Sequence, residues 1–326
     1  EEKRKSSAEQ KKLDDYEKQF DDYKNNVVAK NPKSLLASIL KATTDPKVPD
    51  PPKKADGSID SSFQYYYYKE HYFDGVDWSD YRLLRTPIIE SKLDYYFNKL
   101  VLQLVDSVNK EADFVVRKAE ADTEVFKFTV WWITHTYETS KIMGMDAVFV
   151  HMVQNFYTKE KAYWMSEADL FKIQDKAKQW APILVGKKCR NIVLQDTSGV
   201  YQSLYDMKSD YVVLFFWDPD CGHCQKATPK VVEFYDKMKS KGVEVMGVCT
   251  EVEVDKWKKF VKEKNLQWIN VADPNMKDNF RWDFDLSTTP QIFILDKDKY
   301  IIGKRLDAEQ LEKFIEHDME EKSKKK

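Results

Sequence analysis

Hydrophobic and polar positions divide the chain into two halves with different periods. In the first half, apolar side chains recur every three or four residues, the spacing of one face of an α-helix. The stripes are Leu13, Tyr16, Phe20, Tyr23 and Val27; Ile89, Leu93, Tyr96, Phe97, Leu100 and Leu104; and Met145, Val148, Phe149, Met152, Val153 and Phe156. The first half is therefore predicted to be helical.

Capping residues predict where several of these helices begin. Asn31-Pro32 supplies a cap and a first-turn residue for a helix through Leu40, and Thr86-Pro87 opens the next long stripe. Ser166, with Asp169 three residues later, resembles a capping box for a helix that ends near Trp180.

Two segments of the first half lack a clear helical signal. Residues 45–58, rich in proline, are predicted to be a loop. Residues 124–138 suit a strand or a helix, and we expect a helix because the neighbouring segments are helical.

After Pro182 the pattern changes to short apolar runs separated by turns. Strands are predicted at 191–196, 200–204, 211–217, 243–249, 268–273, 291–296 and 300–305; helices are predicted from the cysteines to about Lys239, around Trp257 and Phe260, around Phe280, and over Leu311, Phe314 and Ile315. Alternation of this kind describes a mixed central sheet flanked by helices. We therefore expect an all-α domain over residues 1–181 and an α/β domain over 182–326.

Composition and charge exclude some classes of function. The formal net charge is −2, which gives no electrostatic footprint for nucleic acid. No apolar stretch approaches the roughly 20 residues that span a bilayer. Because the first residue is Glu1, we expect a processed or truncated chain whose signal segment lies outside it.

Two of the four cysteines, Cys221 and Cys224, form a C-x-x-C motif between a buried strand and a helix. A helix N-terminus stabilises a thiolate at Cys221, and Cys224, one turn on, is placed to attack a mixed disulfide formed there. His223 can add positive charge when it is protonated. Structural zinc is disfavoured because the sequence offers no second ligand pair, and a staple over two residues removes little chain entropy. A redox role is the best interpretation.

The stretches "FFWDPDCGHC" and "STTPQIFILD", together with Pro229, resemble the thioredoxin superfamily. The segment between "VEVMGVC" and "STTP" is similar to the TlpA-like and ResA-like thiol–disulfide oxidoreductases of bacterial cell envelopes. The resemblance covers about residues 182–320. The first half resembles an accessory helical domain that precedes such modules and implies no function.

The resemblance implies roles for individual residues. Cys221 matches the attacking cysteine, Cys224 the resolving one, and Pro290 the proline that is cis in this superfamily. The backbone of Thr289 would then pair with an extended substrate peptide. Trp217 would shield the sulfurs, with burial under the sheet as the alternative, and Pro229 would bend the active-site helix.

The same resemblance implies an enzyme without metal or organic cofactor, located in the periplasm or cell envelope. Its partners would be protein disulfides or dithiols and an upstream thiol reductant. The architecture suggests reduction, whereas the Gly222-His223 dipeptide is shared with more oxidising relatives. A binding or scaffold protein with a regulatory cysteine pair is the alternative, and redox cycling of the pair would separate the two.

Two positions depart from the family pattern. Phe215 stands where many thioredoxins carry a buried aspartate, and Ala227 where ResA-like proteins carry a glutamate. Water or another carboxylate would have to move the proton of the resolving cysteine. The peroxiredoxin motif is missing, because Asp218 and Leu214 occupy its positions ahead of Cys221.

Other candidates favour packing over chemistry. Cys249 is expected to be inert in a buried strand, whereas Cys189 is expected nearer the surface and able to form a mixed disulfide. A metal site from His71, His135 and His151 is not expected. The aromatic cluster of Tyr65–Tyr68, Tyr72, Phe73 and Trp78 is expected to serve core packing rather than to line a groove.

Overall fold

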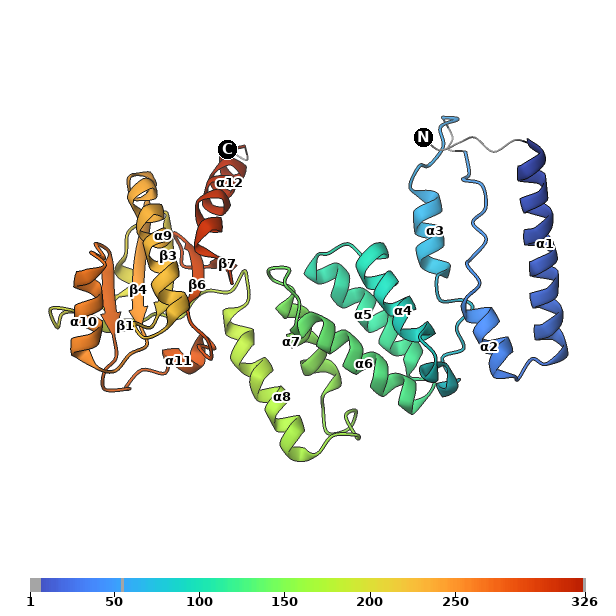
Figure 1. Cartoon of the computed structure of the whole chain (residues 1–326), viewed down its shortest axis with the longest axis horizontal. Helices are drawn as coiled ribbons and strands as arrows, with labels where there is room; N and C mark the ends of the chain where they lie inside the picture. Colours follow the sequence, from blue (N-terminus) through green and yellow to red (C-terminus); the bar gives the residue numbers. More distant parts are fainter. Residues whose placement is uncertain (1–6, 54–55, 325–326) are drawn as a thin grey trace. The chain divides into compact units, whose positions relative to one another are not determined.

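The structure is a computed structural model, and it describes residues 7–53 and 56–324. The chain forms two compact units, one up to Ile133 and one from Thr134 onward. The first unit is helical (Figure 1): its elements are α1 (Ser7–Lys30), α2 (Leu35–Ala42), α3 (Phe63–His71), the 3₁₀ helix η1 (Tyr81–Arg85), α4 (Ile88–Tyr95), the π-helical turn η2 (Tyr96–Leu100), α5 (Val105–Ala119) and α6 (Thr123–Glu138), whose last turn belongs to the second unit.

The predicted helix over residues 124–138 is confirmed by α6, but two helix boundaries differ from prediction. Ser34, not Asn31, caps α2, because its Oγ accepts a hydrogen bond from the N–H of Ala37 at 3.1 Å. Leu104 is 62% exposed and precedes α5. The helical stripe breaks there because the chain leaves the helix after the π turn at Leu100.

The aromatic cluster divides between core and surface. Tyr72, Phe73 and Trp78 are buried and Tyr72 stacks on Tyr96, which agrees with a packing role. Tyr66, in contrast, is 61% exposed. None of the four tyrosines Tyr65–Tyr68 of α3 is buried, so the expected packing role holds for Tyr72, Phe73 and Trp78 but not for this run.

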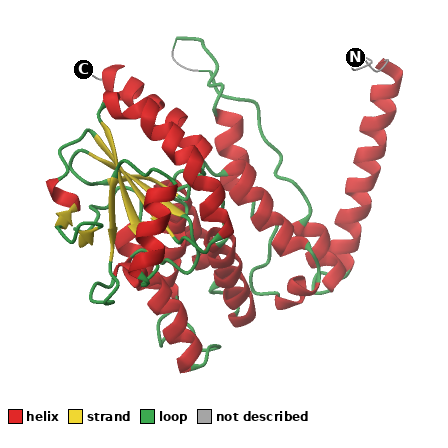
Figure 2. Cartoon of the chain, turned by 60° about the vertical axis from the view of Figure 1, so that its left-hand side comes forward, coloured by secondary structure: helices red, strands yellow, loops and turns green. Residues whose placement is uncertain are grey.

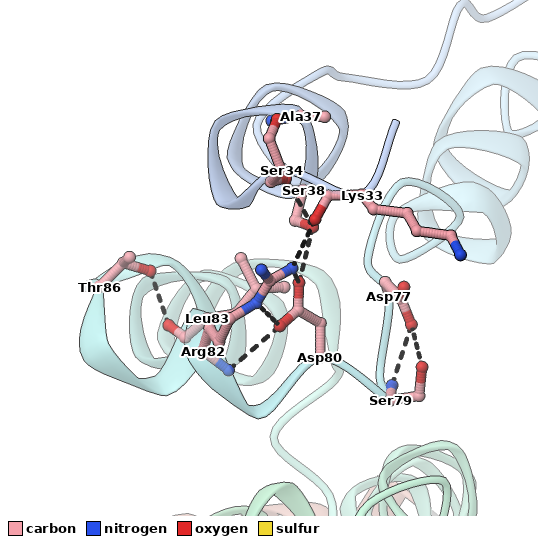
Figure 3. A network of polar contacts seen from close by, with 10 residues as sticks. All are labelled: Lys33, Ser34, Ala37, Ser38, Asp77, Ser79, Asp80, Arg82, Leu83 and Thr86. Carbon is pink, nitrogen blue, oxygen red and sulfur yellow. Dashed lines mark hydrogen bonds and ion pairs between the residues drawn. The ribbon is translucent and has the colours of Figure 1, made fainter. Parts of the chain in front are cut away.

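A polar network joins α2 to η1. Ser38 Oγ on α2 donates to Asp80 Oδ2 at 2.6 Å, and the guanidinium of Arg82 donates to both oxygens of the same carboxylate at 2.7 Å. Figure 3 shows both side chains pointing at Asp80. The hydrogen bonds from Arg82 and then Ser38 outweigh the effect of burial and lower the pKa of Asp80 to about 2.

The second unit contains the sheet. Its elements are α7 (Asp146–Phe156), α8 (Glu167–Trp180), η3 (Ala181–Ile183), β1 (Val193–Asp196), β2 (Tyr201–Ser203), η4 (Leu204–Asp206), β3 (Tyr211–Trp217), α9 (Gly222–Met238), η5 (Lys239–Lys241), β4 (Val243–Cys249), α10 (Val254–Glu263), β5 (Ile269–Ala272), α11 (Phe280–Asp283), β6 (Gln291–Asp296), β7 (Ile301–Lys304), η6 (Ala308–Gln310) and α12 (Leu311–Lys324). Among the described residues these strands form one seven-stranded sheet (Figure 2), in the order β2-β1-β5-β4-β3-β6-β7.

The sheet is mixed, as predicted. Strand β3 is central, parallel to β4 and antiparallel to β6, and every residue of β3 is buried. Side chains of α9, α10 and α12 cover one face, while α11, η3 and the segment around the β1–β2 hairpin cover the other. Alternate residues of β3 serve the two cores, which is why its sequence is a continuous apolar run.

Helices α7 and α8 belong to the same compact unit as the sheet. Lys304 of β7 forms an ion pair with Asp146 at the start of α7 and donates to the carbonyl oxygen of Ile183 at 2.8 Å. Both charged side chains are buried. The chain changes from helices to strands between η3 and β1. The predicted domain boundary between residues 181 and 182 stays a prediction.

Candidate active site

A short turn connects β3 to α9 and places Cys221 at the helix N-terminus. Asp218 Oδ1 accepts the N–H of Asp220 at 2.8 Å, and the carbonyl oxygen of Asp218 accepts the N–H of Cys221 at 3.2 Å. Cys221 is the N-cap residue of α9, and its carbonyl oxygen accepts the N–H of Gln225. The unpaired N–H groups of the first turn therefore surround its sulfur.

The two sulfurs of the C-x-x-C motif lie in different environments. Cys221 is partly exposed, whereas Cys224 is fully buried in the core beneath α9. Cys221 Sγ donates to the carbonyl oxygen of Thr289 at 3.2 Å, and Cys224 Sγ accepts the N–H of Asp218 at 3.4 Å. The predicted difference in exposure is confirmed.

The environments shift the two thiol pKa values in opposite directions. Partial burial opposes charge on Cys221, but hydrogen bonds from the Thr289 side chain and from the N–H groups of Cys224 and His223 lower its pKa below the ordinary value. Burial raises the pKa of Cys224 to about 12, although the hydrogen bond from the N–H of Asp218 acts to lower it. Cys221 is thus the sulfur that ionises first.

The loop between α11 and β6 carries Thr289 and Pro290 to the cysteines. The peptide bond between them is cis, as predicted. The contact between Cys221 and Thr289 joins residues 68 positions apart. The sheet makes this possible because β6 is hydrogen-bonded directly to β3.

A groove of about 410 Å³ runs beside the cysteines. It is lined by His223, Lys226, Ala227, Lys230, Thr289, Pro290, Ile292, Leu306, Asp307, Ala308 and Glu309. His223 and the neighbouring Gly222 are exposed. The sequence analysis did not single out Lys226 and Lys230, although their spacing from His223 places all three on one face of α9.

Trp217 is fully buried, and its ring stacks on Phe260 with centroids 4.6 Å apart. This location agrees with burial under the sheet, the alternative that the sequence left open, and a contact between Trp217 and a substrate stays a prediction. Phe215 is also fully buried on the same strand. Both positions extend the apolar core under the dithiol.

Carboxylates gather on the other side of the turn. Oxygens of Asp218, Asp220 and Glu251 lie within 4.8 Å of one another, the one such group of possible metal ligands in the described part of the chain. Lys256 Nζ lies 3.1 Å from Asp220 and 3.7 Å from Glu251. An ammonium group therefore offsets part of the negative charge of this cluster. Asp218 Oδ2 also accepts a hydrogen bond from the Thr250 hydroxyl at 3.1 Å.

The expectation for Cys189 was wrong. It is 1% exposed, and burial raises its pKa to about 12. Its N–H donates to the carbonyl oxygen of Lys299 at 2.8 Å, which draws the segment before the hairpin against the core. Cys249 is also fully buried with a raised pKa, which agrees with inert packing.

The histidines expected not to form a metal site lie beside residues of their own segments. His71 Nδ1 is 2.6 Å from Asp74, and His135 Nδ1 is 4.0 Å from Glu138. His151 contacts Asn155 on α7.

Comparisons with known proteins match the two halves separately. Residues 8–180 match the family described as a domain of unknown function, DUF5106, and residues 185–303 match the AhpC/TSA family. In the described part of the chain, no helix is both long and apolar enough to cross a membrane.

Individual relatives are similar in sequence to the second half of the chain. The chain is 31% identical over 135 residues to the thiol-disulfide oxidoreductase ResA of Bacillus cereus, which covers 40% of this chain and 77% of that one. The Bacillus anthracis ResA is 32% identical over 135 residues, 40% of this chain and 76% of that protein. A solved thioredoxin-like protein from Bacteroides caccae has the same fold, with a TM-score of 0.65 and 19% identity over 83% of this chain and 96% of that chain.

The match to more than half of the chain, the ResA relatives and the thioredoxin-like fold agree with one another. The chain belongs to the DUF5106 family in its helical first half, and in its second half to the thioredoxin-like thiol–disulfide oxidoreductases of the ResA kind.

Proposed function

We propose that this enzyme reduces disulfides of proteins in the cell envelope, with Cys221 as the attacking thiolate and Cys224 as the resolving thiol. The observation that carries the proposal is the asymmetry of the pair. Cys221 is accessible and has a lowered pKa, while Cys224 is buried and has a raised one. Only one of the two sulfurs is therefore available to an external disulfide.

The reaction follows from this asymmetry. The Cys221 thiolate attacks one sulfur of the substrate disulfide, which forms a mixed disulfide and releases a substrate thiolate. Cys224 then loses its proton, attacks Cys221 Sγ and releases the second substrate thiolate. The substrate gains two electrons from the enzyme, one proton from Cys224 and one from solvent, and the enzyme is left with a Cys221–Cys224 disulfide.

The proton of Cys224 needs an acceptor, because Phe215 and Ala227 occupy the positions of the acids that relatives use. Once Cys221 is in the mixed disulfide it carries no charge, which removes one of the causes that raise the Cys224 pKa, and the substrate thiolate released in the first step can then accept the proton. The proton can therefore pass to the product rather than to a protein carboxylate. Regeneration of the dithiol requires an upstream dithiol reductant of the same compartment.

The substrate surface is assigned to the loop and the groove next to Cys221. An extended peptide can pair with the backbone of Thr289 beside Pro290 and continue along the face of α9 that carries His223 and Lys226. Pairing with backbone groups does not depend on the side chains of the peptide, so many peptide sequences can bind there. The proposed substrates are accordingly proteins rather than small disulfides.

Cysteine replacement tests the proposal with insulin as the model disulfide. Cys221→Ser should abolish its reduction, and Cys224→Ser should accumulate a mixed disulfide that mass spectrometry detects. Cys189→Ala, which removes a buried thiol from the core on the other face of the sheet, is the control and should retain turnover. A Cys224→Ser protein that traps nothing would contradict the assigned roles.

The direction of electron flow needs a separate measurement. Equilibration of the Cys221–Cys224 pair with a glutathione redox buffer gives its reduction potential. A potential more negative than that of glutathione supports a reductase. A more positive value, together with oxidation of a reduced model protein, would instead make the enzyme an oxidant.

A further inference from the structure

The last turn of α8 contacts the segment that leads into the Thr289–Pro290 loop. Trp180 is 4% exposed, and its Nε1 donates to Asp285 Oδ2 at 2.8 Å. The preceding residue, Gln179, donates from Nε2 to the carbonyl oxygen of Trp282 at 2.6 Å. A helix from the part of the chain matched by DUF5106 thus contacts the segment between α11 and β6 at two places.

Asp285 stands at the base of that loop. Its φ of 49° lies in the left-handed region, which an aspartate adopts more readily than most residues. Its carbonyl oxygen accepts from Gln291 Nε2 at 2.7 Å, and Gln291 directly follows Pro290. The backbone of Asp285 therefore closes the loop that runs to Thr289, and its side chain is held by Trp180.

Two further side chains pack against the Trp180 ring. The guanidinium of Arg305 lies 4.6 Å from its ring centroid, and the ring of Phe149 on α7 lies 4.9 Å away. The indole N–H consequently has a fixed direction. Contacts then run without interruption from α7 and α8 through Asp285 to the loop that faces Cys221.

We propose that Trp180 and Asp285 are positioning residues of the dithiol site, which hold the loop so that Thr289 faces Cys221. The inference rests on the proposed function and adds a role for the end of the helical half. When the Trp180–Asp285 hydrogen bond is removed, the loop is released at its base, and the hydrogen bonds of Thr289 to Cys221 weaken. Neither residue touches the sulfurs.

The test is the pH dependence of Cys221 alkylation by iodoacetamide in the reduced full chain. Trp180→Phe keeps the ring and removes the donor, and Asp285→Ala removes the acceptor. Both should slow alkylation at neutral pH about threefold to tenfold, the change that up to one unit in a thiol pKa produces. Asp285→Asn keeps an acceptor oxygen and should behave as the wild type.

Trp257→Phe is the matched control, because Trp257 is 3% exposed and its Nε1 has no hydrogen-bond partner among the described residues. The titratable and charged groups around Cys221 are Cys224 and His223 on α9, Asp218 and Asp220 on the turn, and Lys256 of α10 paired with Asp220. None of these groups is changed in any variant.

Alkylation needs no substrate, so its result is independent of whether the enzyme reduces proteins. Insulin turnover adds a second readout, in which Trp180→Phe and Asp285→Ala should raise KM more than they lower kcat. Unchanged alkylation profiles in both variants overturn the proposal, as does an equal effect of Asp285→Asn. If Trp180→Phe does not fold, the comparison of Asp285→Ala with Asp285→Asn decides alone.

Discussion

Cys221 and Cys224 share one helical turn, yet only one of them meets solvent. The difference arises because Cys221 caps α9 at the end of β3, whereas Cys224, the third residue of the helix, points into the core. Position at the start of the helix thus makes one of two chemically identical thiols accessible and keeps the other buried. The other two cysteines are also buried, Cys249 at the end of β4 and Cys189 in the segment before β1.

This arrangement predicts a single reactive thiol in the native reduced protein. At pH 7 iodoacetamide should modify Cys221 alone, because the thiolate is the reactive form and burial raises the pKa of Cys189, Cys224 and Cys249. Peptide mass spectrometry identifies the labelled residue. Labelling of all four cysteines after addition of guanidinium is the control, and early modification of Cys189 in native protein would disagree with its burial.

His223 is predicted to tune the reduction potential. A protonated histidine favours the reduced thiolate form of Cys221, so His223→Ala should make the pair more reducing. A tenfold change in the equilibrium with glutathione corresponds to about 30 mV. His317→Ala, another exposed histidine but on α12, is the matched control. An unchanged potential in His223→Ala would separate the histidine from the redox pair.

At this scale the sequence predicted the residues that carry local motifs and missed those that depend on distant contacts. Cys221, Cys224 and Pro290 stand in recognisable short patterns, and the structure brings them together. The burial of Cys189 depends on its contact with Lys299, more than a hundred residues later. The bond between Trp180 and Asp285 has no local signature in either segment.

At the scale of elements, the strands were the most predictable part. Every strand predicted after Pro182 is present. Both faces of the sheet are covered at its centre, so every position of β3 is buried, whereas the edge strand β2 has no buried residue. Helix ends were less predictable. At the start of α2, Asn31 and Ser34 are both good caps, and the fold uses Ser34.

The link between α2 and η1 should make helical stability depend on pH. The folded pKa of Asp80 is about 2, below the unfolded value near 4, so its stabilising contribution is complete above that value and is lost as pH falls towards 2. The contribution is about 2 kcal/mol at neutral pH. Asp80→Ala should therefore cost that much in urea unfolding at pH 7 and much less near pH 2.

The exposed Asp77 provides the control for this prediction. Within the described residues, its carboxylate accepts hydrogen bonds from Ser79, two positions later. Asp77→Ala should change the free energy of unfolding by a few tenths of a kcal/mol at either pH. If both variants lose stability equally, the low pKa of Asp80 has no share in the effect.

At the scale of the whole chain, the predicted change from helices to a mixed sheet is confirmed. The boundary between the two compact units, however, lies earlier in the chain than this change. The second compact unit begins at Thr134, so α7 and α8 pack with the sheet. The sequence pattern does not predict that α7 and α8 pack with the sheet, since a helix has the same periodicity whichever neighbour covers its apolar face.

Two truncated chains test this division. A chain of residues 134–326 keeps Asp146 beside Lys304 and should unfold cooperatively. A chain of residues 182–326 loses Asp146 together with α7 and α8, and should therefore be less stable than the longer chain. Urea unfolding followed by fluorescence gives both free energies. Equal stability of the two would place the boundary at residue 182 after all.

The strand order of the sheet also sets a sequence of events during synthesis. Strand β3 lies between β4, which follows it soon, and β6, which is made much later. Thr289 leaves the ribosome 68 residues after Cys221, on the order of several seconds at about 5–20 residues per second. Through that interval the nascent dithiol exists without the loop that later shapes its reactivity. The geometry of the dithiol site is therefore complete only when the last strands of the sheet have been made.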